Sequence, residues 1–92
     1  MAELGGKPYL ETTRENTRRR TFQSTVLEED LVWHRDHSNR HIYILNGSDW
    51  KLQFDNELPI VLERWHTYYI PKKTYHRVIK GKGDLIIDIT ES

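Results

Sequence analysis

Short runs of residues that favour β-strands recur along most of this 92-residue chain, and turn-forming residues separate them. Gly or Asn marks turns at 46–49, 55–57 and 81–83, because these residues tolerate positive φ. Short, evenly spaced strands predict an all-β fold, either a sandwich or a barrel. The expected strands are 21–25, 31–36, 41–46, 50–54, 60–63, 66–70, 75–80 and 84–90.

Alternation within these runs predicts the core. Trp50, Leu52 and Phe54 alternate with polar residues, which is typical of a strand with one face in the core and one in water. We expect these three, Val78 and alternate residues of 85–89 to lie inside. Most of the other aromatic side chains are also expected in the core, because their burial is strongly favourable.

The length predicts one domain, with residues 20–92 as the β-barrel and the polar residues 1–19 as a tail or an edge strand. Lys plus Arg and Asp plus Glu balance at 14 each, so the net charge does not attract nucleic acid or an anionic membrane. The basic run Arg18-Arg19-Arg20 is interpreted as a solvated arm or a charged edge strand rather than a nucleic-acid site.

Two expectations concern the setting of the chain. No apolar run approaches the roughly 20 residues that span a bilayer, and we expect a cytoplasmic protein. A core of this size is modest and its sheet edges need cover, so we expect a homodimer in which the N-terminal segment protects an edge.

A candidate metal site comes from His34 and Asp36, which point to one face if they share a strand. With no cysteine in the chain, histidines and acidic residues are the strong metal-binding side chains available. A third ligand from a distant strand, such as His76, would complete a facial site.

The other histidines are weaker candidates. His37 and His41 project away from the face of His34 in the strand interpretation, so we predict surface imidazoles. His66 could be a fourth ligand, a proton carrier or a half-buried strand residue.

The chain resembles the cupins, small jelly-roll barrels, over residues 26–90. Their first motif reads G-x5-H-x-H-x3,4-E-x6-G; here Glu28, His34, Asp36, Arg40 and Gly47 occupy its five positions with every spacing kept. In the second, G-x5-P-x-G-x2-H-x3-N, the corresponding residues are Trp65, Pro71, Lys73, His76 and Lys80. The resemblance implies a small antiparallel jelly-roll barrel of the cupin type.

The resemblance also implies a divalent metal, which two histidines and a glutamate of the first motif usually hold with the histidine of the second. Because Arg40 replaces the glutamate and Asp36 a histidine, the remaining set is His34, Asp36 and His76. Two imidazoles and one carboxylate suit Fe, and also Mn, Ni or Zn. The alternative is a neutralising Asp36–Arg40 ion pair in a barrel without metal.

Two functions stay open. The first is a metalloenzyme, an oxygenase or isomerase, acting on a small acidic or hydroxylated molecule that Arg40 grips through its carboxylate or phosphate. The second is a metal-free, non-catalytic module that binds a small ligand or serves as a dimerisation unit. The residues do not assign a catalytic acid or base.

Overall fold

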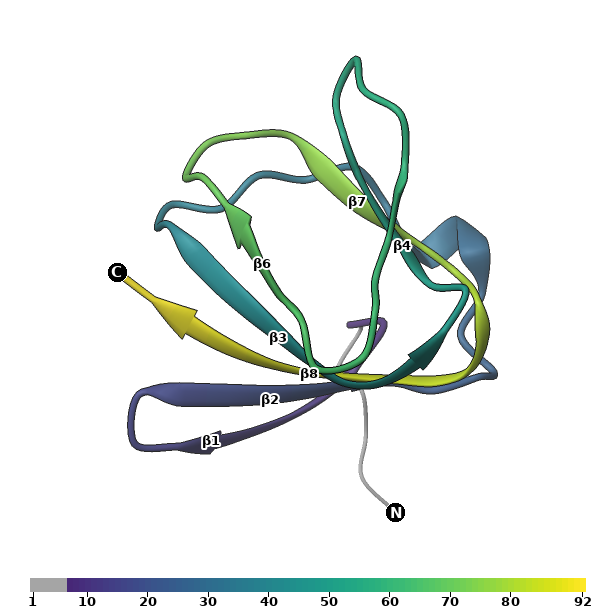
Figure 1. Ribbon diagram of the computed structural model, residues 1–92, viewed down its shortest axis with the longest axis horizontal. Helices are drawn as coiled ribbons and strands as arrows, with labels where there is room; N and C mark the ends of the chain where they lie inside the picture. The colour runs from purple at the N-terminus through teal and green to yellow at the C-terminus, as the bar shows by residue number, and fades with distance from the viewer. Residues whose placement is uncertain (1–6) are drawn as a thin grey trace.

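The computed structural model describes residues 7–92 and is built almost entirely from antiparallel strands (Figure 1). This confirms the predicted all-β fold. The elements are β1 (Leu10–Arg14), β2 (Thr17–Phe22), the 3-10 turn η1 (Glu28–Asp30), β3 (Arg40–Ser48), β4 (Lys51–Phe54), β5 (Ile60–Val61), β6 (Thr67–Ile70), β7 (His76–Ile79) and β8 (Lys82–Glu91). Within this part of the chain, no helix is long and apolar enough to cross a membrane.

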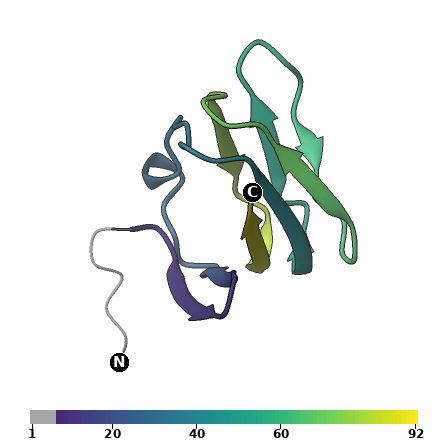
Figure 2. The same ribbon diagram turned by 90° about the vertical axis from the view of Figure 1, so that its left-hand side faces the viewer.

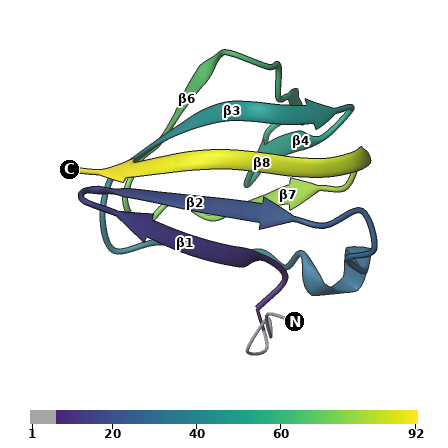
Figure 3. The ribbon, with the colours of Figure 1, turned by 90° about the horizontal axis from the view of Figure 1, so that it is seen from below.

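The strands form two sheets. The larger has the order β1-β2-β8-β3-β6, and Figure 3 shows β1, β2, β8 and β3 side by side. The smaller has the order β5-β4-β7. In Figure 2 the β1–β2 hairpin, in purple, lies at the bottom of the molecule, away from the green strands. The longest strand, β8, therefore occupies the middle of the larger sheet.

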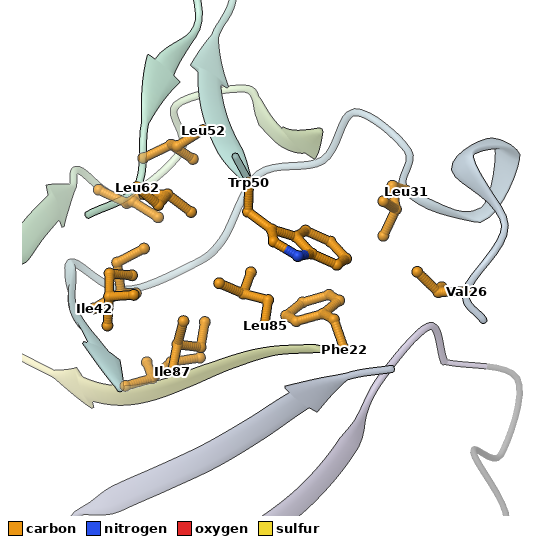
Figure 4. Close-up of a cluster of buried hydrophobic side chains, with 12 residues drawn as sticks. Phe22, Val26, Leu31, Ile42, Trp50, Leu52, Leu62, Leu85 and Ile87 are labelled. Carbon is orange, nitrogen blue, oxygen red and sulfur yellow. The ribbon is translucent and has the colours of Figure 1, made fainter. Parts of the chain in front are cut away.

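The hydrophobic core lies between the two sheets (Figure 4). Trp50 is fully buried, and its ring centroid lies 6.1 Å from that of Phe22. The period-two prediction is confirmed: Leu52 and the alternate residues of 85–89 are buried, while Phe54 and Val78 pack against them. The core residues are Phe22, Val26, Leu31, Ile42, Ile44, Trp50, Leu52, Leu62, Ile70, Leu85, Ile87 and Ile89.

Two expectations were wrong. Residues 31–36 do not form a strand and contain only an isolated bridge at His34, because the segment bends after η1. Most of the aromatic side chains other than Trp50 and Phe54 were expected in the core, but five of them are exposed: Trp33, Tyr43, Trp65, Tyr69 and Tyr75. They lie on outward strand faces or in loops, where alternation gives no burial.

The basic run forms part of β2, paired with the central strand β8. Its residues alternate between the two faces of the sheet, so Arg19 is exposed while Arg20 is buried. Residues 10–14 form the edge strand β1, which pairs with β2 on its other side.

Candidate metal centre

A single backbone bridge brings the two distant histidines together. The His34 N–H donates to the carbonyl of His76 at 3.0 Å, and the His76 N–H donates back to His34 at 2.9 Å. Directly opposed residues in an antiparallel pair place their side chains on the same face. The two imidazole rings accordingly lie 4.3 Å apart between centroids.

Asp36 completes a cluster of three groups that could hold a metal ion. Its Oδ2 lies 3.3 Å from His76 Nε2, and its Oδ1 lies 3.9 Å from His34 Nε2. Metal–ligand bonds of about 2.1 Å allow two ligand atoms on one ion to lie up to about 4.2 Å apart. Each distance lies within this limit, although the two involve different oxygens of Asp36, and one ligand atom from each of the three residues lies within 4.8 Å of the others.

Backbone carbonyls orient both rings. The Nδ1 of His34 lies 3.0 Å from the Val32 oxygen, and the Nδ1 of His76 lies 2.8 Å from the Thr74 oxygen. A carbonyl can only accept, so Nδ1 carries a proton in each of these hydrogen bonds, and when a ring is neutral its Nε2 carries the lone pair on the side of Asp36. This second hydrogen bond is the arrangement that metal-ligating histidines commonly have.

The two oxygens of Asp36 have different surroundings. Oδ1 lies 3.1 Å from Arg40 Nη1, so the predicted Asp36–Arg40 ion pair is present. Oδ2 is buried and has no hydrogen-bond partner among residues 7–92. A buried carboxylate oxygen that has no hydrogen bond and lies 3.3 Å from the Nε2 atom of His76 is unfavourable unless a cation or a proton joins the two groups.

The charges at this site follow from burial. Burial lowers the pKa of His76 below its ordinary value. The hydrogen bond to Thr74 and the charge of Asp36 raise the pKa, but their effect is smaller than that of burial. The ring is therefore neutral near pH 7 and available as a ligand. Burial also lowers the pKa of Arg40, against the effect of Asp36, and Arg40 lies 3.4 Å from Glu91 as well.

The site opens into a cavity of about 320 Å³ between the sheets. The cavity is lined by His34, Asp36, Arg40 and His76, together with apolar side chains such as Ile42, Ile70, Val78 and Ile87. His34 is the most exposed of the three candidate ligands, with 44% of its side chain accessible. A small molecule in this cavity would touch the three candidate ligands and Arg40 directly.

The remaining histidines lie apart from this cluster. His37 and His41 are exposed, as predicted, and the His41 ring packs 5.0 Å from Tyr69. His66 is also exposed, with its Nε2 3.8 Å from Glu63. Neither a fourth-ligand position nor a half-buried position is found for it in the described part of the chain.

Sequence reasoning missed Arg20, which lines the same cavity. The run 18–20 was interpreted by its charge alone, whereas period two within a strand places every second member of the run inward. The inward-facing Phe22, two residues later, was the signal that Arg20 shares the core face.

No family model and no curated protein sequence matches the chain. Solved structures do match. A cupin domain from Bordetella pertussis has a TM-score of 0.65 at 15% identity, covering 94% of this chain and 95% of that one. An RmlC-like cupin family protein with a double-stranded β-helix fold from Methanocaldococcus jannaschii has a TM-score of 0.71 at 11% identity, covering 100% and 86%.

A third structure is iron(II) HppE in complex with substrate, with a TM-score of 0.67 at 13% identity, covering 91% of this chain and 52% of that one. At these identities the likeness defines the fold, a double-stranded β-helix. The chain therefore has the same fold as these cupin proteins, as its motif spacing predicted.

The backbone explains two departures from the motif pattern. Trp65 and Lys73 stand where cupins have glycine, and both adopt left-handed φ, 70° and 60° respectively. That conformation favours glycine, so the turn geometry is kept although the residue type is not.

Proposed function

We propose that this chain binds one divalent metal ion through His34, Asp36 and His76. The observation that carries the proposal is the buried Asp36 Oδ2, which has no hydrogen-bond partner among residues 7–92 and faces the Nε2 atom of His76. Two oriented imidazoles and one carboxylate suit Fe(II), Mn(II), Ni(II) or Zn(II). The fold likeness to cobalt(II) and iron(II) forms of HppE, both in complex with substrate, supports a divalent ion here.

The Arg40 ion pair and the contact with His76 use different oxygens of Asp36. Arg40 bonds to Oδ1, whereas Oδ2 is the oxygen without a partner. In this proposal Arg40, which also lines the cavity, positions the carboxylate. The ion pair is therefore compatible with a metal at Oδ2.

The function that fits this arrangement is chemistry on a small acidic or hydroxylated molecule, either oxygenation or isomerisation. A bound ion would supply Lewis acidity to a substrate oxygen at a coordination position the three side chains leave free. Arg40 would orient the polar end of the substrate, and the apolar walls of the cavity would exclude water.

Metal titration of protein purified without an affinity tag tests the proposal. We expect one ion per wild-type chain and a rise in melting temperature, because a ligand of the native state stabilises it by mass action. His76→Ala and Asp36→Asn should lose both effects. His41→Ala, which removes an exposed imidazole on the outer face, is the matched control and should keep them.

The second candidate function is a metal-free ligand-binding or dimerisation module, which the 3.1 Å Asp36–Arg40 ion pair favours. Equal metal responses of the wild type and His76→Ala would select it. Homodimer formation stays a prediction for either function, supported by the two edge strands β1 and β6 and decided by sedimentation.

A further inference from the structure

The run Arg18-Arg19-Arg20 divides between the two faces of β2. Arg19 points outward and makes a two-point contact with Asp88, at 2.8 and 3.0 Å. Arg18 pairs with Glu91. Arg20 has only 9% of its surface exposed, and it lines the same cavity as the metal-binding cluster. A buried arginine beside an apolar cavity is costly unless its donors have partners.

Arg20 is only partly satisfied by the described residues. Its Nε donates to Glu11 Oε1 at 2.7 Å, and its guanidinium lies 4.1 Å from the centroid of the Tyr9 ring. Its two terminal nitrogens make no hydrogen bond to another of residues 7–92, and because they are not among the buried atoms without a partner, they are accessible to a ligand or to water. A guanidinium offers five N–H donors, and two parallel ones match a carboxylate. By contrast, Arg40 already contacts both Asp36 and Glu91.

The charged side chains around the cavity balance one another, so a bound metal ion would create an excess of positive charge that an anion could neutralise. Around the cavity, Arg18, Arg20 and Arg40 balance Glu11, Asp36 and Glu91, and Lys7 balances Asp30. A divalent ion would add two positive charges without removing any existing pair. A bound anion would then reduce the excess in an environment that screens charge poorly.

The dimensions suit an acid with an apolar body. The 320 Å³ cavity has the volume of roughly ten water molecules, at about 30 Å³ each. One strand, β8, lies between β2 and β3, which are therefore about 10 Å apart across the sheet. Arg20 pairs with Ile87 of β8 and Arg40 with Glu91, so the two arginines are also offset by four residues along the strand. A short branched acid held at Arg20 would lie against Ile42, Ile87 and Ile89, which line the same cavity.

We propose that Arg20 binds the carboxylate of a small acid with an apolar body, whose other end lies at His34, Asp36 and His76. The contact at His34, Asp36 and His76 rests on the proposed function. The contact between Arg20 and the carboxylate does not, because it requires no metal ion. Arg20 is thus the determinant that selects an acid over a neutral molecule of the same shape, and Arg40 acts nearer the metal.

The probe is 4-methylpentanoate, compared with its neutral isostere 4-methylpentanamide, titrated by NMR into zinc-loaded and EDTA-treated protein. We expect the acid to bind about tenfold or more tightly than the amide to the wild type. Arg20→Gln should remove this preference. Arg19→Gln, the neighbour on the outer face, should keep it. The preference should persist with EDTA, although weaker, because less positive charge remains.

Two further measurements keep the test decisive if Arg20→Gln folds poorly. In the wild type, acid binding should shift the NMR signals of the Arg20 Nε–H and of Ile87, its cross-strand partner, and leave those of Arg19 and Asp88 in place. Glu11→Gln should tighten acid binding, because it removes the carboxylate that competes for Arg20. Equal binding of acid and amide, or undiminished binding by Arg20→Gln, would overturn the inference. Absence of zinc binding with the preference intact would overturn the metal proposal alone.

Discussion

The two ends of the barrel share strands but not chemistry. Along the inner face of β8, Leu85, Ile87 and Ile89 are buried and apolar, and the next inward position is Glu91. Adjacent strands change in the same direction: β2 runs from Phe22 to Arg20 and Arg18, and β3 from Ile44 and Ile42 to Arg40. We call the end around Trp50 the closed end and the end around Asp36 the open end. Alternation therefore dictates which residues face inward, and residue type then decides whether that position stabilises the fold or binds a ligand.

The largest effect is expected at the closed end. Trp50→Ala should cost about 3–5 kcal/mol in the free energy of unfolding, because the ring is fully buried and its removal leaves a cavity. Urea denaturation measures it. Trp33→Ala is the control: Trp33 is 41% exposed and stacks on Arg77, so about 1 kcal/mol or less should be lost. Similar losses in the two variants would contradict the contrast between core and surface rings.

Gly81 tests how tightly the closed end is packed. A Cβ at this position would lie 2.2 Å from the Ser48 oxygen and 2.3 Å from the Trp50 nitrogen, both rigid backbone atoms. Gly81→Ala should therefore cost about 1–3 kcal/mol, measured by the urea midpoint. Gly83→Asn is the control, because Gly83 has open space around it and asparagine tolerates its φ of 65°. If Gly81→Ala matches that control, the close approach is wrong.

The open end should give a pH dependence that the closed end lacks. Burial lowers the pKa of His76, so below about pH 6.5 the unfolded chain binds a proton that the folded chain resists. In EDTA-treated protein, stability should therefore fall as the pH drops from roughly 7 to 5, by at most about 1.4 kcal/mol per pH unit from this group.

Subtracting the same curve for His76→Gln isolates this contribution from that of the carboxyl groups. His37→Gln, an exposed neighbour of the site, should leave the curve unchanged. A difference between wild type and His76→Gln that stays flat across this pH range would show that burial does not perturb the ring.

The smallest expected effect has the opposite sign. Lys73 has a φ of 60° and its N–H donates to the Asp36 carbonyl at 2.7 Å. Lys73→Gly keeps that hydrogen bond and relieves the left-handed conformation, so we expect stabilisation of roughly 0.5–1 kcal/mol by thermal unfolding. Lys72→Gly, at a position without positive φ, should give no gain. A destabilised Lys73→Gly would mean that the lysine side chain contributes more than its backbone strain costs.

The sequence allowed the fold and the candidate ligands to be predicted for different reasons. The core strand at Trp50 and Leu52 followed from local alternation, whereas the meeting of His34 and His76 followed from motif spacing. The strand expected at 31–36 does not form, but a single backbone bridge to His76 is enough to place His34. The histidine site thus survived an error in secondary structure.

What local patterns could not provide was pairing between distant segments. Arg20 faces the cavity because β2 pairs with β8, some sixty residues later, and charge density in the run 18–20 carries no information about that partner. The unpartnered Asp36 Oδ2 likewise depends on where Arg40 and His76 come to lie. Both required three-dimensional placement.

The central position of β8 has a consequence for how the chain is made. Residues 82–91 hydrogen-bond to both β2 and β3, so during synthesis neither of those strands has its main partner until this last described strand has left the ribosome. Until then β2 and β3 expose unpaired edges, and the contacts that complete the sheet are almost all non-local, which favours slow folding. β8 therefore has two roles. It joins the strands that carry the cavity residues, and its synthesis allows the exposed edges of β2 and β3 to be covered.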